Sequence, residues 1–217
     1  MEKVKFHPLK THQTYKTDSG ERVDGCSTIA KIGEDSGALI HWAWKCGCEG
    51  LDYRKVRDTA ASTGTLAHWM AECHIRGQEP DLSEFSPAMV AQAETCFIKF
   101  LDWWKGKTLI ASELQLVSNQ HGYGGTMDIL CREDASGRVI LADLKTSKAI
   151  YPSMWRQLAG LNGLVLENLS GDQHPGQFDV VRIGKEDEAD FEVQTRMALG
   201  KEFEAFLAAL DLCRKLK

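Results

Sequence analysis

Residues 125–157 read GTMDILCREDASGRVILADLKTSKAIYPSMWRQ, and their pattern decides the fold. Side chains alternate between the two faces of a strand, so a strand over residues 138–145 presents Asp143 and Lys145 on one face. Apolar residues fill the other positions of both faces from Val139 onward. This pattern predicts a buried central strand. A carboxylate and an ammonium group at the end of such a strand cost free energy unless they pair or bind something.

A polar turn at residues 132–137 joins this strand to a second β-prone run at residues 126–131. If the hairpin is centred just after Ala135, Asp128 lies directly opposite Asp143 on the same face. Directly opposed Cβ atoms are about 5 Å apart. Because two carboxylates this close repel each other, a bound divalent cation is the natural way to keep both ionised.

A third run at residues 109–117 precedes the hairpin. A turn centred just after Gln120 would set Glu113 opposite Asp128 and complete an acidic row that ends at Asp143. Hard oxygen ligands of this kind suit magnesium or manganese better than zinc. The row therefore predicts a divalent metal site.

Lys145 comes two residues after Asp143 and is predicted to project beside the metal. A cation there can orient a water molecule or help to deprotonate it, and it offsets charge that develops on a phosphate. The backbone carbonyl of Leu144 would add a neutral oxygen ligand without further repulsion. The chemistry that these residues predict is metal-assisted phosphoryl hydrolysis.

Each of these residues also has a simpler interpretation. Asp143 and Lys145 alone could form a solvated ion pair at the end of a surface strand. His68 and Glu72 are four residues apart on a predicted helix and could form a local polar pair. Glu113 could be an ordinary exposed strand residue.

The residues from Gly125 to Asp128, followed by Asp143 and Lys145, resemble the signature of the PD-(D/E)xK nuclease superfamily. The second half of the signature has the short form D-x-K in this chain.

Further motifs resemble those of the RecB-like branch of that superfamily. His68, four residues after Gly64, resembles the histidine of the helical G-x-x-x-H element, which is an additional metal ligand in that branch. Gln157 resembles the start of the Q-x-x-x-Y helix, although Leu161 stands where the tyrosine would be. An N-terminal pattern that begins at His12 resembles the lead-in of phage-encoded members.

The resemblance implies an α/β fold with a restriction-endonuclease-like core, in which helices flank a central mixed sheet in the order α-β-β-β-α-β. It implies a deoxyribonuclease that uses one or two Mg²⁺ or Mn²⁺ ions and acts as an exonuclease on linear DNA ends, single- or double-stranded, in phage-type recombination, replication or DNA processing. A single-strand annealing or binding protein is an expected partner. The alternatives are a structure-specific endonuclease and a catalytically silent nucleic-acid-binding or assembly protein of the same fold. The implied catalytic residues are Lys145, Asp143, Asp128 and Gln157, and the implied metal ligands are His68, Asp128, Asp143, Leu144 and Glu113.

The overall charge gives little support to a broad DNA-binding face, because the net charge is −5 and the pI is near 5.8. Lys148 and Arg156 follow the acidic residues, and we expect both to contact DNA. Tyr123 is predicted to stack on unpaired bases, as Trp103, Trp104 or Trp155 could, although large aromatic side chains are more often buried.

Seven cysteines without a secretory or transmembrane segment indicate free thiols in a reducing cytoplasm, that of a bacterial host if the chain is phage-encoded. Cys46 and Cys48 could begin a metal or iron–sulfur site, but the other cysteines provide no C-x-x-C partner, so we expect no cluster. No membrane partner is expected. The chain lacks H-E-x-x-H, so a zincin protease has no support.

Length and composition fit one domain over residues 1–217, with an extended or helical lead-in at about residues 1–50. The pattern predicts helices at residues 37–44, 53–76, 86–104, 152–168 and 188–215. It predicts strands at residues 109–117, 126–131, 138–145 and 177–183.

Overall fold

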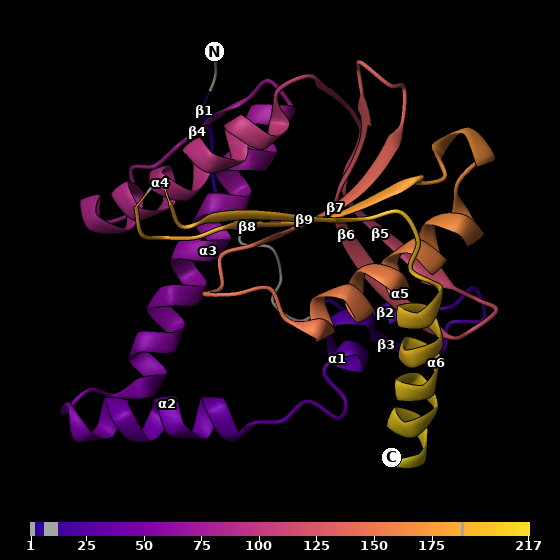
Figure 1. The fold of residues 1–217 in the computed structure, drawn as a ribbon, viewed down its shortest axis with the longest axis horizontal. Helices are drawn as coiled ribbons and strands as arrows, with labels where there is room; N and C mark the ends of the chain where they lie inside the picture. The colour runs from indigo at the N-terminus through magenta and orange to yellow at the C-terminus, as the bar shows by residue number, and fades with distance from the viewer. Residues whose placement is uncertain (1–2, 7–12, 188) are drawn as a thin grey trace.

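The computed structural model describes residues 3–6, 13–187 and 189–217 (Figure 1). Its α-helices are α1 (Cys26–Ala30), α2 (Gly37–Cys48), α3 (Tyr53–Ile75), α4 (Pro87–Trp104), α5 (Pro152–Asn168) and α6 (Gly200–Lys215). Its strands are β1 (Lys3–Val4), β2 (Tyr15–Lys16), β3 (Arg22–Gly25), β4 (Glu79–Pro80), β5 (Lys107–Ser118), β6 (Tyr123–Glu133), β7 (Val139–Lys145), β8 (Gln177–Ile183) and β9 (Phe191–Arg196).

Helices cover both faces of a central mixed sheet, as predicted. Within the described residues this sheet has seven strands in the order β2-β3-β6-β7-β8-β9, with β5 paired to β6. Strands β5, β6 and β7 are antiparallel neighbours, whereas β7 and β8 run parallel. One face packs against α3 and α4, and the other packs against α1, α5 and α6 (Figure 1). The predicted order α-β-β-β-α-β corresponds to α4, β5, β6, β7, α5 and β8.

Strand β7 is buried on both faces, which confirms the first prediction from its sequence. Val139 and Leu141 pack in the core beneath α5 and α6, whereas Ile140 and Leu144 pack in the core beneath α3 and α4. Two helical layers therefore enclose this strand, and Asp143 and Lys145 lie at its C-terminal end.

The start of each long helix has an identifiable cause. Asp52 caps α3 by accepting a hydrogen bond from the Arg54 amide at 2.9 Å. Ser86 caps α4 in the same way, and Pro152 occupies the first turn of α5, where its missing N–H costs nothing. Helix α5 and strand β8 have the predicted bounds, and α2 runs on past Trp44 to Cys48.

The predicted helix at residues 188–215 is wrong in its first half. Glu188 lies outside the described residues, Phe191–Arg196 forms strand β9, and the helix begins only at Gly200. Strand β9 pairs antiparallel with β8 along its whole length. Without β9, the buried strand β8 would leave a row of unpaired backbone groups at the sheet edge, and this tertiary demand outweighs the helical pattern.

The N-terminal lead-in is more ordered than the sequence predicted. Strands β2 and β3 form an antiparallel pair, and β3 then runs parallel to the start of β6 through Asp24 with Tyr123 and Gly25 with Gly124. The predicted lead-in residue His12 lies outside the described residues. The short helix α1 follows β3 directly, so the lead-in is part of the central sheet.

Helix α2 and the start of α3 project from the rest of the molecule (Figure 1). All residues from 51 to 62 are exposed, and α2 carries the exposed ring of Trp44. In the described part of the chain, no helix combines the length and the apolar character that crossing a membrane requires.

Candidate active site

The predicted hairpin register is confirmed where β6 and β7 pair. Ile129 pairs with Ala142, so the next position in this register sets Asp128 opposite Asp143. The ladder ends before that position, and the Leu144 amide donates to Oδ2 of Asp128 at 2.8 Å instead. The two strands therefore separate at the acidic residues, and a carboxylate takes the place of a backbone acceptor.

Glu113 reaches the same point from β5. Its two neighbours pair with Ile129 and Met127, so Glu113 lies opposite Asp128, as predicted. Its φ is 50°, and it is the only non-glycine residue with a positive φ in the described ranges. A left-handed backbone costs roughly 1–3 kcal/mol for such a residue, and strain of this kind gathers at functional sites. The strain here coincides with the position where two carboxylates meet.

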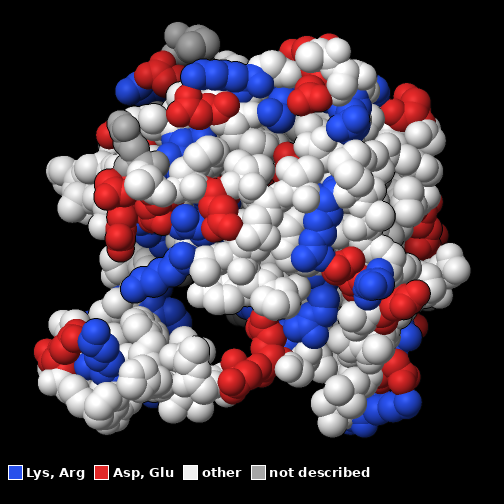
Figure 2. Space-filling view, viewed as in Figure 1, with Lys and Arg blue, Asp and Glu red and all other residues white. Residues whose placement is uncertain are grey.

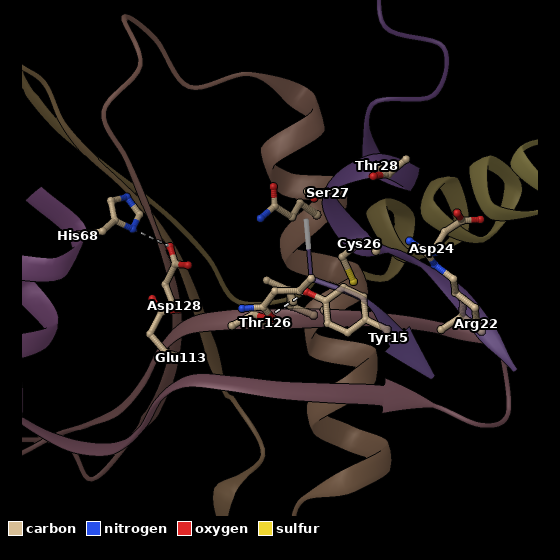
Figure 3. Close-up of a pocket in the computed structure, with 16 residues that line it drawn as sticks. Tyr15, Arg22, Asp24, Cys26, Ser27, Thr28, His68, Glu113, Thr126 and Asp128 are labelled. Carbon is tan, nitrogen blue, oxygen red and sulfur yellow. Dashed lines mark hydrogen bonds and ion pairs between the residues drawn. The ribbon is translucent and has the colours of Figure 1, made fainter. Parts of the chain in front are cut away.

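Helix α3 delivers His68 to these carboxylates. Gly64 lies one turn earlier on the same side of the helix, and a Cβ there would be 2.5 Å from Oγ1 of Thr146. The glycine therefore lets α3 approach the end of β7. Nδ1 of His68 lies 3.8 Å from Oδ2 of Asp128. Ligand atoms of His68, Glu113 and Asp128 lie within 4.8 Å of one another, and no other group of three such side chains is found among the described residues (Figure 3).

Asp143 lies beside this group but is not a member of it. Its side chain is 0% exposed, and its Oδ2 is 2.6 Å from Nζ of Lys145. Gln157 on α5 donates from Nε2 to Oδ1 at 3.2 Å. Among the described residues, the Lys145 ammonium group is the only polar group that pairs with Oδ2. An ionised carboxylate can accept about four hydrogen bonds, so Asp143 keeps acceptor capacity that the described residues do not use.

Burial dominates the electrostatics of the site. Loss of solvent raises the pKa of Glu113 to about 9, with Asp128 adding to the effect, and it raises the pKa of Asp143 to about 6. Burial also raises the pKa of Asp128, against the opposing effects of Lys145 and the Leu144 amide. Burial and the charge of Lys145 lower the pKa of His68 to about 4, so its imidazole is neutral at pH 7. The folded chain alone therefore does not favour three ionised carboxylates.

Lys145 behaves differently from the carboxylates around it. Burial by itself lowers the pKa of its ammonium group, but Asp143 and Asp128 outweigh burial, and the net shift is upward. Lys145 therefore keeps its proton at neutral pH. A group in this state suits the stabilisation of negative charge better than the removal of a proton from water.

A cavity of about 500 Å³ adjoins the acidic group. His68, Glu113 and Asp128 line one part of it, and Gln157 lines its α5 side. The lead-in supplies much of the remaining wall from β2, β3 and α1, including Tyr15 (Figure 3). The site is therefore open to a ligand of moderate size and is not a closed metal cage.

The structure separates the simpler interpretations from the functional ones. A solvated surface ion pair is wrong for Asp143 and Lys145, since Asp143 is 0% exposed. Glu72 forms an ion pair with Arg76 at 2.9 Å, which leaves His68 directed at Asp128.

One of the predicted DNA contacts is wrong. Tyr123 is fully buried, and its hydroxyl donates to the Gly160 carbonyl at 2.9 Å, so the prediction that it stacks on bases is wrong. Trp103 and Trp155 are buried too. Arg156 is partly buried and donates to the backbone carbonyl of Ile32, two residues beyond the end of α1, whereas Lys148 is exposed.

Lysine and arginine side chains are interspersed with acidic ones on the face that Figure 2 shows, and the described residues there form no broad basic surface. This distribution agrees with the net charge of −5. Any attraction to a nucleic acid would therefore depend on local contacts near the cavity more than on a long-range field.

Sequence reasoning missed the part of the cavity wall that comes from the lead-in. A Cβ on Gly124 would be 2.3 Å from the Tyr15 ring, and one on Gly25 would be 3.1 Å from it. The adjacent glycines Gly124 and Gly125 at the start of β6 were the available signal, because glycines in a strand often mark the close approach of another group. They did not reveal which ring approaches.

No protein-family model matches this sequence, and no curated protein sequence matches it. Solved structures do match at low identity. SSO0001 is 13% identical over 61% of this chain and 62% of that chain, with a TM-score of 0.38. The alkaline exonuclease LHK-Exo from Laribacter hongkongensis is 13% identical over 88% of this chain and 92% of that chain, with a TM-score of 0.41. Its complex with dAMP is 12% identical over 89% and 90% of the two chains, with a TM-score of 0.39.

Proposed function

We propose that the protein is a metal-dependent deoxyribonuclease that hydrolyses phosphodiester bonds at DNA ends. The observation that carries this proposal is the convergence of His68, Glu113 and Asp128 within 4.8 Å, next to a buried Asp143 whose acceptor capacity is only partly used. Three strands and a helix place these groups at one point beside an open cavity. Such an arrangement is costly for a fold that has no use for it.

The residues fit a divalent metal. Carboxylate oxygens and a neutral imidazole are ligands that magnesium or manganese accepts, and no thiol lies among them. Asp128, Glu113 and His68 would hold the ion, with Asp143 and the Leu144 carbonyl as further ligands. A bound cation would favour the ionised carboxylates and would polarise the phosphate and the attacking water.

The remaining roles follow from the contacts of Asp143. Lys145 lies 2.6 Å from its Oδ2 and would stabilise charge on the phosphate as the water attacks and the leaving oxygen departs. Gln157 donates to Oδ1 and would orient the carboxylate. Lys148, exposed just beyond β7, would contact the DNA backbone, and Arg156 would support that side of the cavity.

Action from an end is the preferred form of this activity. A chain with net charge −5 has little general attraction to duplex, so productive binding would depend on one strand that enters the cavity. The resemblance to the RecB-like branch favours the same mode, in phage-type recombination, replication or DNA processing. A single-strand annealing or binding protein would then be a natural partner.

Incubation with linear and covalently closed DNA, single- and double-stranded, in the presence of magnesium or manganese tests the proposal. We expect degradation of linear DNA and intact circles. Asp128→Asn is the control, since it keeps the shape of the side chain but removes its charge. Rapid linearisation of a supercoiled plasmid would favour an endonuclease. Loss of all cleavage with retained DNA binding would favour the catalytically silent alternative.

A further inference from the structure

Two hydrogen bonds organise the cavity wall next to the acidic group. The hydroxyl of Thr126 donates to Oε1 of Gln13 at 2.7 Å, so its oxygen is free to accept from the Tyr15 hydroxyl at 3.0 Å. The three side chains come from the lead-in and from β6, and all of them line the cavity. They form a connected polar wall that we call the Tyr15 wall.

Two glycines pack against the Tyr15 ring and hold it in place. Gly124 and Gly25 lie against it so closely that a Cβ on either would meet the ring, at 2.3 Å and 3.1 Å. Apart from the imidazole of His68, it is the only aromatic ring among the described residues that line the cavity. An immobilised ring that stays partly exposed is a ready surface for stacking, because little conformational entropy is lost when a second ring packs on it.

The Tyr15 wall lies close to the candidate metal ligands along β6. Thr126 and Asp128 are two residues apart on β6, which corresponds to about 7 Å along a strand. Both line the same cavity. A nucleotide whose phosphate lay at Asp128 would therefore bring its base towards Tyr15.

We propose that the cavity binds one unpaired nucleotide, with its base stacked on the Tyr15 ring while its phosphate lies at the acidic group. This inference rests on the proposed function and names its substrate class, an unpaired DNA end. A base that enters the cavity lined by β6, α1 and α5 has to leave its partner strand. Single-stranded or frayed ends are then better substrates than blunt duplex ends.

The test uses the full chain, a single-stranded oligonucleotide with 2-aminopurine near its end, and the Asp143→Asn variant to prevent cleavage. Stacking on tyrosine should quench the 2-aminopurine fluorescence on binding. Tyr15→Leu should remove the quenching, and in the otherwise unchanged protein it should raise KM for single strands about 5- to 100-fold. Tyr15→Phe should preserve both, because it keeps the ring. Trp44→Leu, which removes an exposed ring on α2, is the matched control and should change neither.

Several outcomes overturn the inference. Binding of the oligonucleotide by Asp143→Asn without any quenching would contradict it directly, even if Tyr15→Leu fails to fold. An unchanged KM in a stable Tyr15→Leu protein, or faster degradation of blunt duplex than of single strands, would contradict it as well. If the unchanged protein cleaves no DNA but the oligonucleotide is still quenched, the proposed function fails while the nucleotide site stands. If the unchanged protein cleaves DNA but the oligonucleotide is not quenched, the proposed function stands and the stacking on Tyr15 fails.

Discussion

Two buried aspartates on neighbouring strands differ in how completely the protein satisfies them. Asp143 on β7 is 0% exposed and Asp179 on β8 is 2% exposed. Asp179 accepts three hydrogen bonds, from Nε1 of Trp103 at 3.1 Å, Nε2 of Gln177 at 3.1 Å and Oγ1 of Thr195 at 2.8 Å. It needs no cation nearby, because neutral donors surround it.

Asp143 has only one such donor, Gln157, and an ion pair with Lys145. An ionised carboxylate can accept about four hydrogen bonds, so part of its capacity is unused. The contrast teaches that burial alone does not mark a functional carboxylate in this protein. Unused acceptor capacity beside an open cavity does, and four substitutions can test that distinction.

Asp143→Asn should have the largest effect. It keeps the shape of the side chain but removes the charge that would help to hold a metal, so we expect cleavage of linear DNA to fall by at least about 100-fold. Thermal stability without metal should fall as well, because the Lys145 ammonium group loses the charge of its buried partner at 2.6 Å, so cleavage is compared below the melting temperature of both proteins. Cleavage at the original rate would show that the charge of Asp143 has no role in the chemistry.

Lys145→Ala should abolish cleavage to a similar degree but for another reason. Its ammonium group would act on the phosphate, so the variant should still bind manganese, whereas Asp143→Ala should bind manganese more weakly. Calorimetric titration of both variants, beside a cleavage assay, measures the difference. Equal loss of manganese affinity in the two variants would contradict the separation of roles.

Gln157→Ala should have an intermediate effect. Removal of a group that orients a metal ligand typically costs about 10- to 100-fold in activity or metal affinity. Gln177→Ala is a matched control, since Gln177 also donates to a buried aspartate, at 3.1 Å. Cleavage rates of the two variants should therefore differ by about tenfold or more. Similar rates would mean that Gln157 serves only the fold.

Asp179→Ala should have the smallest effect on cleavage and a clear effect on stability. It leaves the indole N–H of Trp103 and two further donors without their acceptor, which should cost about 1–3 kcal/mol in the free energy of unfolding. Chemical denaturation measures that loss. The cleavage rate of the folded variant should stay within about twofold of the original. A large loss of cleavage would contradict the distinction between Asp179 and Asp143.

The strand registers were predictable because a hairpin turn sets every pair once its centre is known. The turns before β6 and before β7 are short and polar, so Glu113, Asp128 and Asp143 could be placed in one row from sequence alone. The burial of Asp143 was equally predictable from the apolar residues on both faces of β7.

Other features depend on contacts between segments that are distant in the sequence. The left-handed backbone of Glu113 has no local cause such as a glycine, so no pattern in the sequence predicts it. The sequence also grouped Asp143 with Asp128, whereas the tightest group contains Glu113 and His68. The pairing of β9 with β8 and the position of Tyr15 arise in the same way, from demands that only the assembled sheet imposes.

The opening between β6 and β7 has a spectroscopic consequence. The Leu144 amide donates to a side-chain oxygen of Asp128 at 2.8 Å, where a regular ladder would offer a carbonyl. Any ion that draws electron density from that carboxylate weakens this one bond, so the nitrogen and proton chemical shifts of Leu144 and its deuterium exchange should report when the carboxylate is occupied. The strand end thus contains an intrinsic probe that needs neither a label nor a substrate, and its signal is independent of turnover.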